Sequence, residues 1–265
     1  MNTLSGSDPT SGAGRPAPTP TSGTGTAVSA VRCEGLSRRY GEGEASVLAV
    51  DDVSLDFPHG QLTSIVGPSG SGKSTLMHVL AGLDRPTEGK VWVDGTQITG
   101  LGDSELTELR RDKLGFIFQF FNLIPVLSAE ENVTLPMRIA GRDADPEWLD
   151  RLLDTVGIAD RRKHRPAELS GGQQQRVAVA RALIAKPAVV FADEPTGNLD
   201  STSSAQVLDL LRRSVDELGR TVVVVTHDPR VASYADRVVL LVDGKVAQDT
   251  RVTGEDQVLE LMRSA

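Results

Sequence analysis

The sequence predicts an α/β fold built on a mostly parallel sheet with helices on its faces. Three observations support this prediction: short apolar strands alternate with amphipathic helical stretches, a Gly-rich loop joins one buried strand to a helix, and 265 residues suit one large domain or two small ones. Apolar residues make up 39% of the chain and charged residues 24%, which is ordinary for a globular protein. Collagen-like, wholly disordered and disulfide-scaffold classes are therefore excluded.

Charge and cysteine content narrow the class further. The formal net charge is -8, which argues against a general affinity for nucleic acid or anionic lipid. Cys33 is the only cysteine, so the chain forms no intramolecular disulfide and no Cys-based zinc site of its own, and it suits a reducing cytosol. The longest apolar runs fall far short of the roughly 18 residues of a membrane-spanning helix. We therefore do not expect this chain to cross a membrane by itself.

Residues 1–27 differ in composition from the rest of the chain. Ser, Thr, Gly, Pro and Ala dominate them, Asp8 and Arg15 are their only charges, and they lack the apolar segment of a signal peptide. Such a segment buries too little apolar surface to offset its ordering entropy. We predict a disordered tail over residues 1–27, followed by one domain over residues 28–265.

The first half of the domain reads as strands followed by alternating helices and strands. β-branched runs, apolar periodicity and turn residues such as those at 58–60 give the boundaries. The predicted elements are strands at 31–40, 47–57 and 61–66, a helix from Lys73 to about Leu80 that stops near Gly82, a strand at 90–95 ending in an Asp-Gly turn, a helix at 103–113 and a strand at 114–119.

The second half begins with a helical insertion between Ser128 and Gly157. Ser128 and Glu131 form a capping box, and Pro146 stands near the first turn of a later helix that ends at Gly157. Strands return at 188–194, 221–227 and 237–244, with helical stretches between them. There is no internal repeat, which excludes two tandem copies of the site described next.

Gly67 to Thr75 reads GPSGSGKST and fits the pattern G-x-x-x-x-G-K-[ST] directly after an apolar strand and before a helix. Backbone N–H groups of such a loop point inward and, with the helix N-terminus, cradle phosphates. In this chemistry Lys73 places a charge on the β and γ phosphates and Ser74 ligates Mg²⁺. The alternative, a plain Gly-Ser turn, explains neither the spacing nor the flanking strand.

Two further motifs are weak by themselves. The strand AVVFADE delivers Asp193, which can hold Mg²⁺ through water, and Glu194, which can polarise the water that attacks the γ-phosphate. Alone, this pair also fits a buried strand ending in an acidic turn. LSGGQ at Leu169 to Gln173 places a Ser as the cap of a Gly-Gly helix start, which creates a second anion site, although a simple capped helix explains the same residues.

In this combination the sequence resembles the nucleotide-binding subunit of ABC transporters over about Val31 to Met262. The signature LSGGQ lies between the phosphate loop and the acidic strand, in the order typical of that family. The resemblance implies a RecA-like P-loop NTPase core (ABC ATPase) with an antiparallel β subdomain near residues 31–60 and 89–100. It also implies an α-helical subdomain at about 120–168, and ATP and Mg²⁺ as cofactors.

The resemblance also assigns roles to side chains. Tyr40 resembles the aromatic that stacks on adenine, and Gln119 the glutamine that senses Mg²⁺ and the membrane partner. Residues 198–200 resemble the loop that crosses the dimer interface, and His227 the histidine that contacts the γ-phosphate. Tyr40 alone also fits a core residue and His227 alone a strand-end histidine, while His59, His78 and His164 keep structural roles. The expected catalytic residues are Glu194, His227, Gln119 and Lys73; the expected nucleotide-binding residues are Tyr40, Gly67, Pro68, Ser69, Gly70, Ser71, Gly72, Lys73, Ser74, Thr75, Ser170, Gly171, Gly172, Gln173 and Asp200; the expected metal ligands are Ser74, Gln119 and Asp193.

Three segments are similar in sequence to macrolide-export, lipoprotein-releasing and cell-division ATPases: FQFFNLIPVLSAEENVTLPM, HRPAELSGGQQQRVAVARAL and ADEPTGNLD. This subgroup implies two partners: a second copy of the chain, which completes two ATP sites as a homodimer, and a membrane permease, possibly with a large extracytoplasmic domain. We therefore expect a cytoplasmic protein held at the inner face of the cell membrane through the permease, with no nucleic acid partner.

Two rival classes of protein fit these motifs less well. ABC ATPases that act on DNA separate the two motifs by a long coiled coil and ribosomal ones carry two cassettes in one chain, and neither pattern is present here. A P-loop kinase or GTPase gives no reason for LSGGQ or Glu194.

Four apolar residues follow the expected end of a strand, and we predict that they line a groove for a short permease helix: Phe120, Phe121, Leu123 and Ile124. The alternative is that they cap the core of the helical subdomain.

Overall fold

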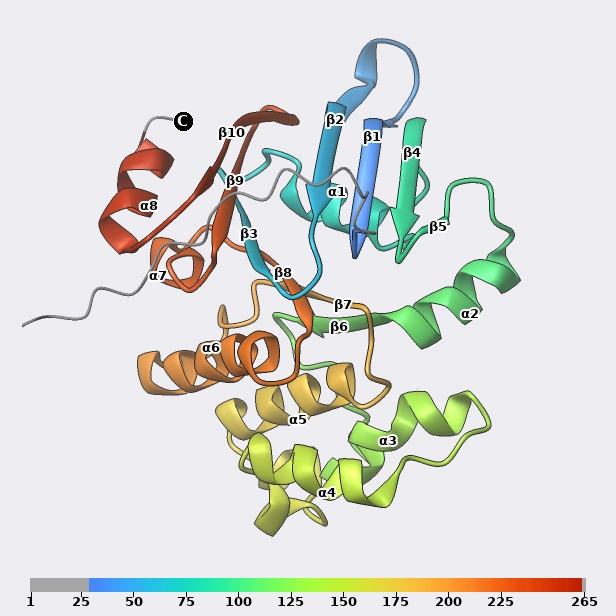
Figure 1. The fold of residues 1–265 in the computed structure, drawn as a ribbon, viewed down its shortest axis with the longest axis vertical. Helices are drawn as coiled ribbons and strands as arrows, with labels where there is room; N and C mark the ends of the chain where they lie inside the picture. Colours follow the sequence, from blue (N-terminus) through green and yellow to red (C-terminus); the bar gives the residue numbers. More distant parts are fainter. Residues whose placement is uncertain (1–28, 264–265) are drawn as a thin grey trace, which may run out of the picture.

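The computed structural model describes residues 29–263, and the tail predicted over residues 1–27 lies outside them. Two sheets organise this part of the chain (Figure 1). Helices pack between the sheets and over the far side of the larger one, so the molecule has the layered α/β architecture that the sequence predicts. No helix within residues 29–263 is long and apolar enough to span a membrane.

The larger sheet has six strands in the order β10-β9-β3-β8-β7-β6. Its strands are β3 (Leu62–Val66), β6 (Leu114–Phe118), β7 (Val189–Asp193), β8 (Thr221–Val225), β9 (Arg237–Val242) and β10 (Lys245–Arg251). All neighbouring pairs are parallel except β9 and β10, which pair antiparallel at one edge. The central strands are buried on both faces, which is why they read as continuous apolar runs rather than alternating patterns.

The smaller sheet is antiparallel, with strand order β2-β1-β4-β5. Its strands are β1 (Val31–Tyr40), β2 (Val47–Phe57), β4 (Glu88–Val93) and β5 (Thr96–Gln97). The predicted Asp-Gly turn joins β4 to β5, with Asp94 and Gly95 at φ 46° and 78°. This sheet is the antiparallel β subdomain that the sequence predicts.

Eight α-helices occur in the described residues: α1 (Lys73–Leu80), α2 (Asp103–Lys113), α3 (Ala129–Ile139), α4 (Pro146–Thr155), α5 (Gly171–Leu183), α6 (Ser201–Asp216), α7 (Pro229–Ala232) and α8 (Glu255–Arg263). Short 3-10 turns occupy Gly43–Ala45, Ala159–Arg161 and Pro166–Glu168. The predicted capping box is present: the Ser128 Oγ accepts from the Glu131 N–H at 3.2 Å, and the Glu131 Oε2 accepts from the Ser128 N–H at 2.8 Å. β10 and α8 were not predicted individually, because β10 is largely exposed and polar and gives no apolar period.

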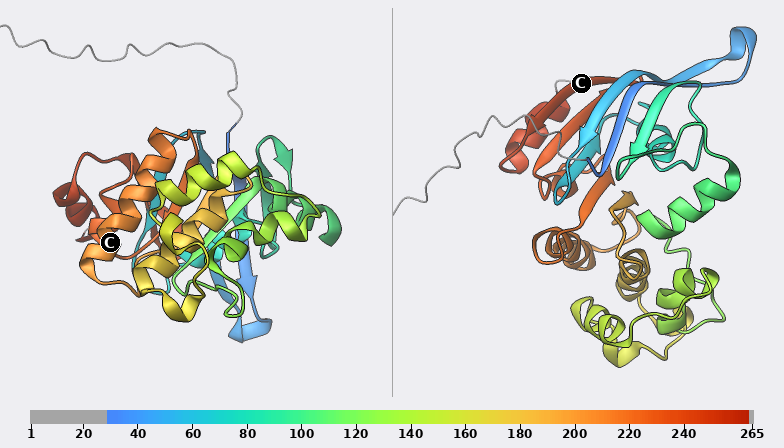
Figure 2. Two further views of the ribbon diagram at one scale, coloured as in Figure 1. Left: turned by 90° about the horizontal axis from the view of Figure 1, so that it is seen from below. Right: turned by 45° about the vertical axis from the view of Figure 1, so that its right-hand side comes forward.

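Neighbouring residues of the parallel strands serve two separate cores. In β8, Val223 and Val225 face the core that contains Leu76 and Met77 of α1, whereas Val222 and Val224 face the core that contains α5 and α6. Figure 1 shows α1 against the smaller sheet, with α5 and α6 on the other side of the larger one. Figure 2 shows α3 and α4 at the end of the molecule remote from the smaller sheet. The helix after the Gly-rich loop, α1, and the helix that begins within LSGGQ, α5, therefore lie on opposite sides of the larger sheet.

Candidate nucleotide-binding and catalytic site

The Gly-rich loop connects β3 to α1 and is held between two other strands. A Cβ atom at Gly67 would lie 2.0 Å from the carbonyl oxygen of Leu241, and one at Gly72 would lie 2.0 Å from that of Ala49. Gly72 also adopts the left-handed conformation, with φ 96°, immediately before α1 begins. Both positions therefore require glycine, for close approach as well as for backbone conformation. Pro68, Ser69 and Gly70 are exposed at the mouth of the loop.

Lys73 is the first residue of α1, and its side chain turns back onto this loop. Its side chain is buried, and its Nζ donates to the carbonyl oxygens of Gly67 at 2.9 Å and Pro68 at 2.7 Å. Burial lowers the pKa of Lys73, and the negative charges of Glu194 and Asp193 oppose that shift. The ammonium group is thus held at the loop, where it places a positive charge.

Ser74 and Asp193 bring two oxygen donors together from different elements. The Ser74 Oγ, at the start of α1, lies 3.2 Å from the Asp193 Oδ1, at the end of β7. Burial raises the pKa of the Asp193 carboxyl, and the hydrogen bond from Ser74 opposes that shift. Hydroxyl and carboxylate oxygens are the hard ligands that Mg²⁺ takes alongside phosphate oxygens and water. The donor set therefore fits this ion, even though residues 29–263 contain no cluster of three or more His, Cys, Asp and Glu that by itself would hold a metal.

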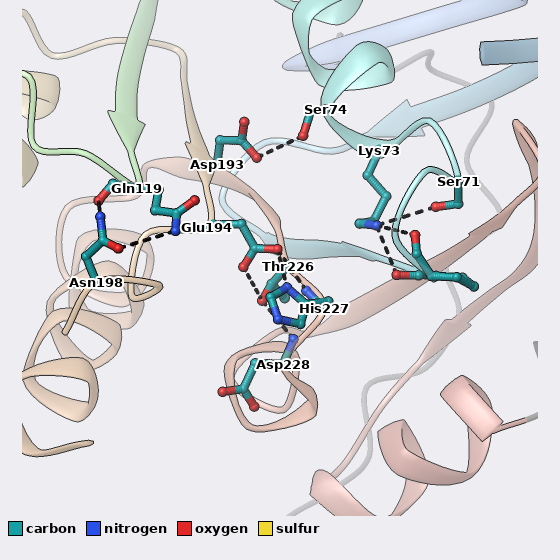
Figure 3. A network of polar contacts seen from close by, with 12 residues as sticks. Ser71, Lys73, Ser74, Gln119, Asp193, Glu194, Asn198, Thr226, His227 and Asp228 are labelled. Atoms are coloured by element: carbon teal, nitrogen blue, oxygen red, sulfur yellow. Dashed lines mark hydrogen bonds and ion pairs between the residues drawn. The ribbon is translucent and has the colours of Figure 1, made fainter. Parts of the chain in front are cut away.

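Glu194 follows β7 and turns toward the end of β8 (Figure 3). Its Oε1 lies 2.6 Å from the Nδ1 of His227 and accepts from the His227 backbone N–H at 3.2 Å. Its Oε2 accepts from the Thr226 Oγ1 at 3.2 Å. Glu194 itself has φ 46°, and its N–H donates to the Val225 carbonyl at 2.9 Å. The structure therefore brings both predicted catalytic side chains, Glu194 and His227, into direct contact.

Gln119 lies on the other side of Glu194, immediately after β6. Its Nε2 lies 3.4 Å from the Oδ1 of Asn198, whose Nδ2 donates to the Gln119 carbonyl at 3.0 Å. A Cβ at Gly197 would lie 2.9 Å from the Gln119 Nε2, so the glutamine rests directly on this glycine. Asp200, two residues after Asn198, caps α6 by accepting from the Ser203 N–H at 2.9 Å, and this hydrogen bond lowers the pKa of Asp200.

Tyr40, at the end of β1, is not a core residue, because 39% of it is exposed. Its hydroxyl donates to the Asp84 Oδ2 at 2.6 Å, and the Arg38 guanidinium carbon lies 4.4 Å from the ring centroid. Arg38 and Asp84 also form an ion pair at 2.9 Å. The contacts with Asp84 and Arg38 hold the Tyr40 ring at the surface, and the Arg38 guanidinium forms a cation–π contact with one side of it.

The LSGGQ motif begins α5 and forms a second capping box. The Ser170 Oγ accepts from the Gln173 N–H at 3.3 Å, and the Gln173 Oε1 accepts from the Ser170 N–H at 2.9 Å. A Cβ at Gly172 would lie 2.6 Å from the Ser203 Oγ of α6. Ser170 is exposed, and α5 packs on the opposite side of the larger sheet from α1 (Figure 1). One chain therefore holds LSGGQ away from its own phosphate loop.

Three side chains near this site escaped the sequence reasoning: Thr226, Gln175 and Arg181. Thr226 is almost fully buried, and its Oγ1 also accepts from the Asp228 N–H at 3.0 Å while it contacts Glu194. Gln175 and Arg181 lie on α5 and contact backbone carbonyls of other elements. No local pattern marks their contacts with Glu194, Phe118, Pro195, Phe121 and Asn122, because those partners are distant in the sequence.

A phosphate-binding loop over a buried lysine, set at the carboxyl ends of parallel strands beside two carboxylates, defines the class of P-loop nucleotide-binding proteins. The family model described as "ABC transporter" matches residues 50–197, and the chain belongs to that family. This confirms the resemblance seen in the sequence.

Several relatives share most of the chain. An uncharacterized ABC transporter ATP-binding protein of Methanocaldococcus jannaschii is 44% identical over 232 residues, covering 85% of this chain and 99% of that protein. A lipoprotein-releasing system ATP-binding protein, LolD 1 of Chlorobium chlorochromatii, is 48% identical over 212 residues, covering 79% and 86%. The macrolide export ATP-binding/permease protein MacB 1/2 of Paracoccus denitrificans is 47% identical over 228 residues, covering 85% of this chain but 34% of its own length.

Solved structures agree with these relatives. A dimeric ATP-binding cassette in a post-hydrolysis state, bound to ADP and Pi, matches with a TM-score of 0.76 at 43% identity, covering 84% of this chain and 99% of that one. A second dimeric structure of the same cassette matches with a TM-score of 0.75. The fold of this chain is therefore that of an ABC ATPase cassette, with the predicted antiparallel β and α-helical subdomains.

Proposed function

We propose that this chain is the ATP-binding and ATP-hydrolysing subunit of an ABC transporter and that it powers a separate membrane permease. The observation that carries the proposal is the position of Glu194, one residue after Asp193 and in contact with His227, at the strand ends next to the Lys73 loop. Family membership and the ADP- and Pi-bound relative support ATP as the nucleotide.

The reaction converts ATP and water into ADP and phosphate. In the proposed mechanism the backbone amides of residues 67–75 and the Lys73 ammonium bind the β and γ phosphates, and Tyr40 stacks on adenine. Ser74, Asp193 and Gln119 would hold Mg²⁺, directly or through water. When bound, Mg²⁺ supplies positive charge that offsets the charge developing on the phosphate oxygens. Glu194 accepts a proton from the attacking water, while His227 orients Glu194 and contacts the γ-phosphate.

Two copies are needed for a complete site. Because LSGGQ and the phosphate loop of one chain lie on opposite sides of the larger sheet, the donors at Ser170 to Gln173 reach a γ-phosphate only when they come from a second chain. The similarity to dimeric cassettes supports this homodimer. We infer that each ATP is enclosed between the loop of one protomer and the signature motif of its partner, and that hydrolysis is slow until both close.

The permease contact lies near the loop after Gln119. An apolar groove of about 480 Å³ runs between β6, α2 and α5 and is lined by residues that include Leu83, Arg110, Phe116, Phe118, Asn122 and Arg181. None of the four residues predicted to line a groove lines this one. Phe120 and Ile124 are exposed, Leu123 packs against the core that contains α5 and α6, and Phe121 contacts Gly171. We propose that a short permease helix enters this groove, where Phe118 and Asn122 form part of the lining, and that it also contacts the exposed Phe120 between them in the chain, which would hold this protein at the inner face of the membrane.

Phosphate release by the purified full-length chain tests the function. With ATP and Mg²⁺ we expect steady-state hydrolysis whose specific rate rises with protein concentration, since the active species is a dimer. Chelation of Mg²⁺ should abolish the rate. A matched surface change, Glu217→Gln, should leave it unchanged, because Glu217 is exposed and forms an ion pair with Arg213 near the end of α6. A chain that binds ATP but releases no phosphate at any protein concentration, with or without its permease, would contradict the proposal.

A further inference from the structure

Gln175 of α5 connects the segments that carry Gln119 and Glu194. The side chain is completely buried. Its Nε2 donates to the carbonyl oxygen of Phe118 at 3.2 Å and to that of Pro195 at 2.6 Å. Phe118 immediately precedes Gln119, and Pro195 immediately follows Glu194. One amide group therefore bridges the two backbones at the points where the proposed metal-sensing glutamine and the proposed general base leave the sheet.

This bridge begins where the sheet ladder ends. The last paired residues of β6 and β7 are Phe118 and Asp193, and the strand pairing does not continue beyond them. Both partners of Gln175 are carbonyl oxygens, so only the NH₂ side of the amide satisfies them and its orientation is fixed. The Gln175 Oε1 is then left buried without a hydrogen-bond partner among the described residues. One buried amide therefore holds two backbone segments at a set separation through its two donated hydrogen bonds.

A second side chain of α5 holds the other end of the same loop. Arg181 donates to the carbonyls of Phe121 at 2.9 Å and Asn122 at 2.6 Å, and burial lowers its pKa. Gln119 thus lies between two backbone positions that are both fixed by α5. Since α5 begins at the signature motif, the helix that would meet the nucleotide of the partner subunit also sets the position of Gln119 in its own chain.

We propose that Gln175 is a positioning residue for ATP hydrolysis: it fixes Gln119 and Glu194 relative to each other, from the helix that begins with LSGGQ. The inference rests on the proposed ATPase function. A general base must lie within hydrogen-bond reach of the proton it accepts, and a misplacement of about 1 Å costs on the order of 10² in rate. Loss of the bridge should therefore lower kcat and weaken the use of Mg²⁺, while ATP binding to the phosphate loop persists.

The test is Gln175→Met in the full-length chain, which keeps side-chain length and burial but removes both donors. We expect kcat to fall about tenfold or more, the Mg²⁺ concentration for half-maximal rate to rise, and the Kd for ATP to stay within about twofold. Asn132→Leu is the matched control: Asn132 is an equally buried amide that joins backbone groups of Ile124 to Ser128, away from Glu194. Its variant should melt earlier with an unchanged kcat below the melting range.

Arg181→Lys provides a second variant, because a lysine reaches one of the two carbonyls and keeps the charge. We expect a smaller fall in kcat with the same rise in the Mg²⁺ requirement. Wild-type kcat and Mg²⁺ dependence in folded Gln175→Met would overturn the inference while leaving the ATPase function intact. Failure of both α5 variants to fold, or a loss of ATP affinity equal to the loss of kcat, would assign these residues to folding and likewise overturn it. A wild-type chain without Mg²⁺-dependent hydrolysis would instead remove the proposed function itself.

Discussion

The Nδ1 of His227 lies 2.6 Å from the Oε1 of Glu194, although 33 positions separate the two residues in the chain. The parallel register of β7 and β8 pairs Asp193 with Val225, so the residues that follow each strand emerge side by side at the same edge of the sheet. This edge also receives the loop after β3. The contact therefore results from strand pairing, and it places a group able to orient the carboxylate next to the proposed base.

Glu194→Gln should retain ATP and Mg²⁺ binding but abolish turnover. Glutamine keeps the side-chain shape of glutamate and can still accept hydrogen bonds from Thr226 and the His227 backbone, but it accepts no proton from water. The loss of a general base typically costs about 10² to 10⁴ in rate. We expect ATP to hold the variant as a stable dimer, measured by size-exclusion chromatography with and without nucleotide. Steady-state hydrolysis within about tenfold of wild type would rule out the assigned role.

Lys73→Ala should weaken ATP binding itself. The carbonyl oxygens of Gly67 and Pro68 hold the ammonium group at the loop, so its charge is in place for the ground-state phosphates. Calorimetric titration with ATP should show a clear fall in affinity, in contrast to Glu194→Gln. Lys90→Ala, at an exposed lysine of β4, serves as the control and should bind ATP as wild type does. Equal affinities for the Lys73 and Lys90 variants would contradict the phosphate contact.

Asp193→Asn should raise the melting temperature of the nucleotide-free protein at neutral pH. Burial raises the pKa of Asp193, so the folded state binds its proton more tightly than the unfolded chain does. The corresponding stability is fully present below the unfolded pKa and is lost as the pH rises through the folded pKa. At neutral pH the ionised carboxylate therefore opposes folding, and a neutral amide does not.

Thermal melts across pH, without nucleotide or Mg²⁺, measure this effect. The advantage of Asp193→Asn should shrink as the pH falls from the raised pKa of the folded state to the ordinary carboxyl pKa of the unfolded chain, and the same variant should lose Mg²⁺-dependent hydrolysis. A variant that melts below wild type at neutral pH would show that Asp193 stabilises the fold instead.

Phe120→Asp and Phe121→Asp should have different consequences. Phe120 is 69% exposed, so a carboxylate there leaves the fold and ATP affinity intact but disrupts an apolar contact with the permease. The Phe121 ring packs on Gly171 at the start of α5, so Asp at that position should lower the melting temperature. Co-purification with the permease, together with thermal melts, separates the two effects. Normal permease binding by Phe120→Asp would place the docking surface elsewhere.

Deletion of residues 1–27 should leave ATPase activity and the melting temperature nearly unchanged. Their composition offers too few apolar side chains to offset the entropy of ordering them. A melting temperature several degrees lower for the shortened chain would show that this segment packs on the domain.

The sequence by itself determined the fold class, the phosphate loop and the order of the motifs. These depend on local information. Apolar runs mark buried strands, Gly72 and Lys73 occupy fixed positions of the phosphate-loop motif, and Ser128 and Glu131 cap a helix across one turn. The same local rules gave no signal for β10, whose residues are mostly exposed, or for Gln175, which sits on a helical face that reads simply as buried.

Only the tertiary structure decided which side chains meet. Strand register brings Glu194 to His227 and Ser74 to Asp193, and helix packing brings Gln175 to Phe118 and Pro195. It also places LSGGQ on the side of the larger sheet opposite the phosphate loop, and it packs Phe121 on Gly171 while leaving Phe120 exposed. The physical reason is that such contacts join residues far apart in the chain. Their geometry is fixed by how the two sheets and α5 pack together, whereas sequence patterns report only on neighbours within a few turns.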